Sequence, residues 1–298
     1  MSPIRRIPIA DPFDLAATIG TVAGPGGATS RFVDGIHYRA SRNGHGDVQL
    51  ALRRDGSEVV AEAWGAGAVA ELEMVPRLLG LDDDPSSFSP PPGPVRELVR
   101  SNRGLHLGST GRVVEALVPA ILGQRVTSQA AKRSYYSLVR ALGESAPGPP
   151  GLRVPPPAER LAALDYEDFH RHGVERSRAV IIREVARRAK RMEEIVAMDR
   201  AAAYERLQAI RGVGPWTAGH VMGVAWGDRD AVPVGDFHLP NSVSWLLAGE
   251  ARADNARMLE LLEPFRPHRR RVVVLTKRGH VAAPKYGPKS AVQDIRTH

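Results

Sequence analysis

Short apolar segments separated by turn sequences make up most of the first ninety residues. Three segments combine β-branched and aromatic residues in the manner of strands: 31–42, 47–54 and 58–64. Asn-Gly and Asp-Gly pairs, which favour tight turns, lie between them. A helical stretch at 14–22 precedes the strands, and apolar residues at helical spacing over 69–79 follow them. This pattern predicts a small α+β domain over residues 1–92, closed by a proline-rich linker at 85–94.

The pattern from residue 93 onward is almost wholly helical. Apolar residues recur at helical spacing in three long segments: 113–122, 129–142 and 176–195. Residues 145–157 are rich in proline and glycine and predict a loop inside the domain. The predicted fold class is mainly α, with a helical domain over 93–280 after the small α+β domain. Residues 281–298 lack periodicity and carry basic side chains, so we expect a flexible tail there.

Composition narrows the choice of partners and chemistry. The formal net charge is +8, and such an excess favours a polyanionic partner such as nucleic acid. There is no cysteine, which excludes disulfides, thiolate nucleophiles and cysteine-held zinc or iron–sulfur clusters. No apolar run approaches the roughly 20 residues that span a bilayer, and the N-terminus has two arginines without an apolar stretch. We therefore expect a cytoplasmic protein with no membrane contact.

The segment 207–218, Leu-Gln-Ala-Ile-Arg-Gly-Val-Gly-Pro-Trp-Thr-Ala, is the most informative part of the chain. One helix is expected to end near Ile210. Gly212 and Gly214 permit a tight, partly left-handed hairpin, and Pro215 suits the first position of the next helix because that position needs no amide hydrogen. Free amides at such a hairpin can converge on one phosphate. A plain helical hairpin with a glycine turn is the alternative, and the full string favours phosphate binding over it.

A carboxylate follows the hairpin at a distance of about twenty residues. Residues 231–240 contain a short extended piece that places Asp236 directly after Gly235. The alternative is that Asp236 only caps the following helix, which is a common role of aspartate. Local sequence alone favours capping, whereas the position of Asp236 downstream of the hairpin favours a chemical role.

Together these segments resemble the helix-hairpin-helix DNA glycosylase superfamily, and within it the bacterial 3-methyladenine DNA glycosylase II type. Four stretches carry the likeness: 120–131, 210–218, 232–239 and 266–269. The resemblance covers about 95–277, and the N-terminal strands are more loosely similar to the TATA-binding-protein-like domain of that type. It implies a monomeric enzyme that binds double-stranded DNA, extrudes a damaged base and hydrolyses its N-glycosidic bond in base excision repair. An alkylated base is the expected substrate.

The same resemblance implies roles for individual residues. DNA contacts are expected from the hairpin and from the loop after the first long helix of the domain: Gly212, Gly214, Pro215, Thr217, Gln124 and Arg125. That loop supplies the side chain that fills the gap left by the extruded base. Arg125 departs from the apolar wedge of the nearest relatives, and an ordinary phosphate contact is an equal interpretation. Asp236 is the expected catalytic carboxylate, because bond cleavage leaves cationic character on the sugar and a water molecule must be oriented.

The positions of the lysines bear on strand cleavage. Bifunctional relatives carry a lysine two residues after the second hairpin glycine, where it attacks the sugar. Here that position is Trp216, and no lysine lies between Lys190 and Lys277. We therefore predict a monofunctional enzyme without lyase activity, with Lys277 as the one residue that would make this prediction wrong. The absence of cysteine separates the chain from the iron–sulfur branch of the superfamily, so no cofactor is expected.

The base pocket follows the family pattern less closely. A family aromatic residue four positions after the hairpin tryptophan is His220 here, and another falls near Lys277 or Arg278. A lysine at the pocket would repel a cationic base. Trp216 and Phe237 are more typical of a core than of a pocket. The candidate pocket residues are Trp216, His220, Phe237, His238 and Lys277.

Two other functions stay open at this point. One is a helix-hairpin-helix DNA-binding protein without excision activity, which the altered pocket and Arg125 favour and Asp236 disfavours. The other is a monofunctional glycosylase for oxidised or deaminated bases. Metal catalysis has little support, because the histidines are scattered without the spacing of metal ligands.

Overall fold

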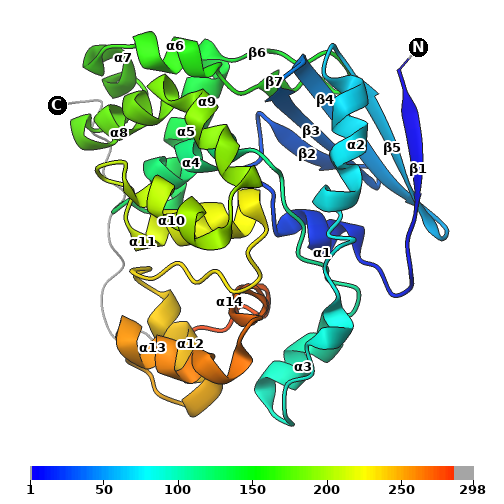
Figure 1. Cartoon of the computed structure of the whole chain (residues 1–298), viewed down its shortest axis with the longest axis vertical. Helices are drawn as coiled ribbons and strands as arrows, with labels where there is room; N and C mark the ends of the chain where they lie inside the picture. Colours follow the sequence, from blue (N-terminus) through cyan, green and yellow to red (C-terminus); the bar gives the residue numbers. More distant parts are fainter. Residues whose placement is uncertain (1, 285–298) are drawn as a thin grey trace.

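The computed structural model describes residues 2–284. A sheet with two helices forms one part of the molecule, and the remaining helices form a larger body beside it (Figure 1). This mainly helical arrangement with a small antiparallel sheet confirms the predicted fold class. Most of the predicted tail, 285–298, lies outside the described residues. Within them, no helix is long and apolar enough to cross a membrane, and no three His, Cys, Asp or Glu side chains cluster as metal ligands would.

The sheet is antiparallel, with the strand order β1-β5-β4-β3-β2. Its strands are β1 (Ile4–Pro8), β2 (Ser30–Val33), β3 (Ile36–Asn43), β4 (Gly46–Asp55) and β5 (Glu58–Trp64). The prediction of one strand over 31–42 is wrong, because Asp34 and Gly35 adopt left-handed backbone angles and turn the chain into a β2–β3 hairpin. β1 was not predicted, since only Ile7 of it is buried and a single buried residue gives no alternating pattern.

Two helices, α1 (Leu15–Gly20) and α2 (Ala68–Leu78), pack on the apolar face of the sheet. Figure 1 shows α2 lying over the strands, and its buried residues join those of β4 and β5 in one core. Asp14 caps α1 by accepting a hydrogen bond from the Ala17 amide at 2.8 Å, which satisfies one of the free amides of its first turn. A short 3₁₀ turn, η1 (Pro85–Ser87), lies in the proline-rich linker.

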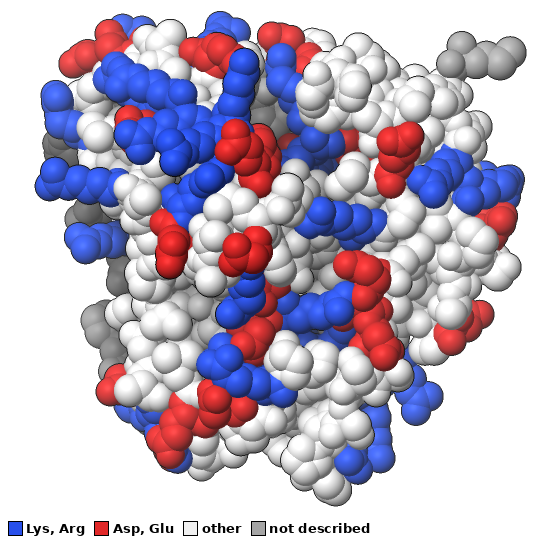
Figure 2. Space-filling model, in the orientation of Figure 1, with Lys and Arg blue, Asp and Glu red and all other residues white. Residues whose placement is uncertain are grey.

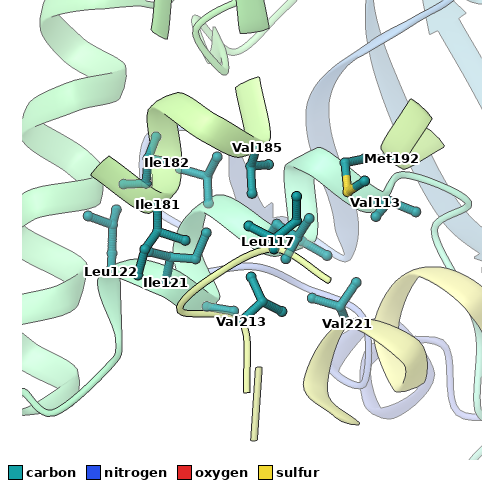
Figure 3. Packing of buried hydrophobic residues seen from close by; sticks show 14 of the residues in the cluster. Val113, Leu117, Ile121, Leu122, Ile181, Ile182, Val185, Met192, Val213 and Val221 are labelled. Atoms are coloured by element: carbon teal, nitrogen blue, oxygen red, sulfur yellow. The ribbon is translucent and has the colours of Figure 1, made fainter. Parts of the chain in front are cut away.

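The first half of the helical body is built around α4 (Val113–Leu122), a helix that is buried on nearly every side. The other helices of this half are α5 (Ser128–Leu142), α6 (Ala158–Ala163), α7 (Tyr166–His170), α8 (Arg176–Arg187), α9 (Ala189–Glu193), α10 (Arg200–Gln208) and α11 (Pro215–Val221). Figure 3 shows Leu117 and Ile121 of α4 in one cluster with Ile181 of α8 and Val213, which precedes α11. The predicted loop at 145–157 contains β7 (Arg153–Val154), which pairs with β6 (Glu144–Ser145).

The single helix predicted over 176–195 is wrong in one respect. The chain breaks at Arg188, whose backbone leaves the helical region between α8 and α9, and a 3₁₀ turn, η2 (Glu194–Ala197), follows. The change of direction buries both Met192 and Ile195 in the core around α4. Burial of these two side chains therefore outweighs the continuity of the helix.

The second half of the helical body has its own core. Its helices are α3 (Pro94–Ser101), α12 (Leu239–Ala248), α13 (Asn255–Leu262) and α14 (Arg269–Arg278), with the short turn η4 (Glu263–Phe265) preceding α14. The π-helical segment η3 (Met222–Trp226), which follows α11, packs instead in the core around α4. At the start of α14, Arg269 donates to the Asp230 carboxylate at 2.8 and 2.6 Å. The domain boundaries at 92 and 280 stay predictions. Phe88, which precedes the boundary at 92, packs into this second core. The segment 231–238, which contains Asp236, connects the two halves.

Candidate functional site

The hairpin between α10 and α11 depends on one glycine more than on the other. Gly212 has a φ of +95°, and a Cβ there would lie 2.4 Å from Cδ1 of Ile181. Gly214 has a φ of −90°, and no atom lies within 4 Å of its Cβ direction. The predicted left-handed backbone therefore falls on Gly212 alone. Pro215 opens α11 as predicted, and within the described residues the amides of Gly212 and Gly214 donate no hydrogen bond.

The loop after α4 is tied to this hairpin through Gln124. Its Nε2 donates to the carbonyl oxygen of Gly212 and to Oγ1 of Thr217, both at 2.9 Å. Thr217 is buried and its hydroxyl is paired with Gln124, and its predicted role in DNA binding stays a prediction. Arg125, next in the loop, has a φ of +55° and an exposed side chain. The loop thus supports the hairpin with one residue and presents the other to solvent.

Asp236 is held by hydrogen bonds to both of its oxygens. Oδ1 accepts from the amides of His238 and Leu239, each at 2.9 Å, and Oδ2 accepts from the indole Nε1 of Trp216 at 3.3 Å. Gly235 precedes it with a φ of +100°, and its amide donates to Oδ1 of Asn255 at 2.9 Å. Asp236 is not the N-cap residue of α12, which is His238; one of its oxygens nevertheless accepts from two amides at the start of that helix, while the other faces the hairpin tryptophan.

The surroundings of Asp236 keep it ionised at neutral pH. Burial alone would raise the pKa of this carboxyl group, but the charge of Lys277, the amides of His238 and Leu239 and the indole of Trp216 together hold the pKa below its usual value. A carboxylate that is half-buried and still charged is suited to stabilising positive charge that develops next to it.

Trp216 and His220 stack on each other along α11. Their ring centroids are 6.1 Å apart and their planes differ by 13°. A Cβ on Gly123 would lie 3.4 Å from the far edge of the Trp216 ring, so α4 approaches the tryptophan closely. Desolvation by the surrounding protein, followed by the charges of Lys277 and Arg270, lowers the pKa of His220 to about 4. His220 is therefore neutral at pH 7.

The other candidate pocket residues lie in different environments. Trp216 is half-buried and packs against the core around α4. The expectation that Phe237 belongs to a core is wrong, since its side chain is 86% exposed. His238 is exposed and contacts the Phe237 ring edge-on at 4.8 Å between centroids. Lys277 is exposed in the last turn of α14.

Sequence reasoning missed two residues of this region. Asn255, the first residue of α13, carries the amide oxygen that fixes Gly235, and no local pattern links the two positions. Arg270 belongs to a run of three arginines that suggests an exposed basic surface, yet it is buried. It packs against Gly223 and donates to the carbonyl oxygen of Thr21 at 3.2 Å, and burial lowers its pKa to about 10.

Away from this site, a basic area lies over α8 and α9, where Lys and Arg side chains gather in Figure 2. Arg188, Arg191 and Arg206 line an open groove there. Arg188 pairs with Glu184 at 2.5 Å and Arg206 with Glu194 at 2.6 Å. Because two of the three guanidinium groups already have carboxylate partners, we assign no function to this groove.

A glycine hairpin and a charged aspartate thus lie side by side at this site. The chain belongs to the HhH-GPD superfamily of base excision DNA repair proteins, whose family model matches residues 118–267. This range contains the Gln124 loop, the hairpin and the Asp236 segment. The resemblance that the sequence motifs indicated is therefore confirmed.

Two relatives have similar sequences. The chain is 28% identical over 250 residues to the "Probable bifunctional transcriptional activator/DNA repair enzyme AlkA" of Mycobacterium tuberculosis, covering 78% of this chain and 49% of that protein. It is 29% identical over 168 residues to the DNA-3-methyladenine glycosylase of Bacillus subtilis, covering 55% of each. The chain thus spans about half the length of the relatives it matches.

Two solved structures share the fold almost throughout. The 3-methyladenine DNA glycosylase from Archaeoglobus fulgidus has a TM-score of 0.79 at 19% identity, with 93% of this chain and 98% of that chain covered. The 8-oxoguanine glycosylase/lyase of Clostridium acetobutylicum, solved with double-stranded DNA, has a TM-score of 0.74 at 15% identity, with 94% and 98% covered. The likeness of fold therefore includes the N-terminal sheet as well as the helical body.

Proposed function

We propose that this protein is a monofunctional DNA glycosylase that hydrolyses the N-glycosidic bond of an extruded, damaged base in double-stranded DNA. The observation that carries the proposal is the placement of Asp236. Its charged carboxylate lies 3.3 Å from the indole nitrogen of Trp216, which lies two residues after the second hairpin glycine. A hairpin that holds the DNA backbone therefore lies beside a group that stabilises positive charge.

The two oxygens of Asp236 have different tasks in this proposal. Oδ1 is occupied by two backbone amides, which fix the orientation of the carboxylate. Oδ2 has only the indole of Trp216 as a partner among the described residues, so it is the oxygen available to the sugar and to water. The bond between C1′ and the base breaks with its electron pair going to the base. Water then adds to C1′, and its proton balances the charge on the released base.

The lysine distribution supports hydrolysis rather than strand cleavage. Trp216 occupies the position of the lyase lysine in bifunctional relatives. Lys277 is the lysine whose charge acts on Asp236, and it lies on α14 rather than on the hairpin. An amine must attack C1′ to form the Schiff base of a lyase reaction. We therefore expect no covalent protein–DNA adduct in the presence of borohydride.

An alkylated base is the first candidate substrate, because two of the similar proteins are named 3-methyladenine glycosylases. A second candidate is a neutral oxidised or deaminated base. The charges of Lys277 and Arg270 that act on His220 favour this second class, since a positive environment disfavours a cationic alkylated base. A structural neighbour is named an 8-oxoguanine glycosylase/lyase.

A panel of duplexes tests the proposal. Each duplex carries one alkylated, deaminated or oxidised base and is incubated with the wild-type protein, with and without subsequent alkali. We expect base release that breaks the strand only after alkali, and no adduct with borohydride. Strand breaks without alkali together with a trapped adduct would show that the protein is a lyase, and Lys277→Arg would then identify the amine. Tight binding without release from any duplex would favour the DNA-binding alternative.

A further inference from the structure

The most exposed large apolar side chain of the described residues is next to the candidate catalytic carboxylate. Phe237 is 86% exposed, whereas Phe13, Phe88 and Phe169 are at most 7% exposed. Phe32 is the only other phenylalanine among the exposed large apolar residues of the described chain, at 53% on the edge strand β2. An aromatic ring held in water gains no burial in the free protein. The position of Phe237 therefore needs an explanation.

The backbone on both sides of Phe237 is fixed. On one side, Asn255 binds the amide of Gly235, whose φ of +100° sets the direction of the segment. On the other side, Oδ1 of Asp236 accepts from the amides of His238 and Leu239, and Leu239 is buried. The same hydrogen bonds that orient the carboxylate thus turn the Phe237 ring outward, and the edge-on contact with His238 supports the ring.

We propose that Phe237 stacks on DNA next to the extruded nucleotide and stabilises the extruded state. The inference rests on the proposed function, which places Asp236 at the C1′ of that nucleotide. Consecutive Cα atoms are about 3.8 Å apart, so the Phe237 ring is within one side-chain length of the same nucleotide. Extrusion of a base removes a stacking partner from its neighbours, and an aromatic ring replaces such a partner irrespective of base identity.

Arg125 makes this role of Phe237 more specific. The loop after α4 presents a charged, exposed Arg125, directly after the Gln124 that is hydrogen-bonded to the hairpin. A guanidinium group contacts phosphate well, whereas the gap in a base stack is apolar. Phe237 supplies the apolar surface near the carboxylate that Arg125 lacks. In this arrangement Arg125 contacts the phosphates and Phe237 contacts the unstacked base.

The experiment uses two duplexes. One carries a stable abasic-site analogue with a fluorescent 2-aminopurine beside it, and the other carries the damaged base that the wild-type protein releases fastest. Stacking on an aromatic ring quenches 2-aminopurine. Loss of one base–aromatic stack lowers affinity by about 5- to 150-fold. We therefore expect Phe237→Ala to lower both the affinity for the abasic duplex and the rate of base release by a factor in this range. The quenching of 2-aminopurine should be lost. Phe237→Trp should retain both. Phe32→Ala is the matched control and should behave as wild type.

The outcomes separate this inference from the proposed function. If wild type releases base and Phe237→Ala matches it in quenching, affinity and rate, the stacking role is wrong and the glycosylase assignment stands. If the wild type releases no base but quenches 2-aminopurine in the abasic duplex, and Phe237→Ala does not quench it, the stacking role stands and the glycosylase assignment fails. The wild type and Phe237→Ala should bind undamaged duplex with equal affinity. If Phe237→Ala loses as much affinity for undamaged duplex as for the abasic duplex, Phe237 is a general DNA contact and the proposal is overturned.

Discussion

The two regions that act on Asp236, the hairpin before α11 and the helix α14, interact with their surroundings in different ways. On the hairpin side, Gln124 and the backbone of Gly212 join through short, neutral hydrogen bonds. On the α14 side, Arg270 and Lys277 lie two helical turns apart, which is the same face of a helix, and act on the site through charge. The hairpin side lies within the residues that the family model matches, whereas Arg270 and Lys277 on α14 lie beyond them. We infer that the first side holds DNA and the second adjusts which base is accepted.

This contrast separates geometry from electrostatics as sources of function. Hydrogen bonds of the hairpin act over about 3 Å and fail completely when one partner moves. Charges on α14 act over longer distances and change gradually with substitution and with salt. Changes on the hairpin side should therefore affect stability and DNA affinity, while changes on α14 should affect pH dependence and the choice of base.

Gly212→Ala should have the largest effect of the substitutions that test this contrast. The φ of +95° is strained for alanine, and the new Cβ would lie 2.4 Å from Cδ1 of Ile181. We expect a loss of about 1–3 kcal/mol in the free energy of unfolding and weaker DNA binding, measured by urea denaturation and by titration with duplex. Gly214→Ala is the matched control, with φ at −90° and open space around the Cβ direction. Equal losses in both variants would contradict the assignment of the left-handed position to Gly212 alone.

Gln124→Ala tests the tie between the α4 loop and the hairpin. The substitution removes the donor to the Gly212 carbonyl and to Thr217 Oγ1. A typical net hydrogen bond is worth about 1 kcal/mol, so the loss of both bonds should lower DNA affinity by up to about 30-fold, as measured in binding titrations. Base selectivity should not change. Gln129→Ala, an exposed glutamine on α5, should leave affinity at the wild-type level, and a change in base selectivity by Gln124→Ala would argue against the separation of the two sides.

Lys277→Met tests the charged side and should have the smallest effect on the maximal rate. Lys277 helps to hold the pKa of Asp236 below its usual value, so its loss raises that pKa. The carboxylate is active when ionised, and the acidic limb of the pH–rate profile should move to higher pH. Release of cationic bases should improve relative to neutral ones. Arg278→Met, which removes a neighbouring charge that binds Asn102, should change neither property. An unshifted acidic limb in Lys277→Met would contradict the electrostatic role.

Much of the fold could be predicted because its patterns are local. The buried helix α4 and the strand β5 have the bounds that the sequence predicts, since the apolar residues that define each element lie within the element itself. The break at Arg188 could not be predicted, because it depends on burying Met192 and Ile195 against a core that distant segments provide. Two consecutive left-handed positions, Asp34 and Gly35, divide one expected strand into two.

The candidate site was predictable where residue type fixes backbone geometry. Pro215 begins α11 for this reason, and Asp236 was indicated by its position after the hairpin. The environment of each side chain was not predictable. Phe237 has an apolar side chain typical of cores. Its exposure is explained only by the hydrogen bonds that the backbone amides of its neighbours Gly235 and His238 donate to Asn255 and Asp236. The burial of Arg270 likewise depends on Gly223, which is far away in the sequence.

The most direct test of the account is single-turnover base release by Asp236→Asn and wild type on the same damaged duplex, with duplex affinity measured in parallel. Asparagine keeps the size and the Oδ1 acceptor for the amides of His238 and Leu239 but removes the charge. The account predicts that release falls by about 100- to 1000-fold, as for loss of one transition-state-stabilising group, while affinity stays within a few-fold. Release by Asp236→Asn at a rate close to that of wild type would contradict the central role of this carboxylate.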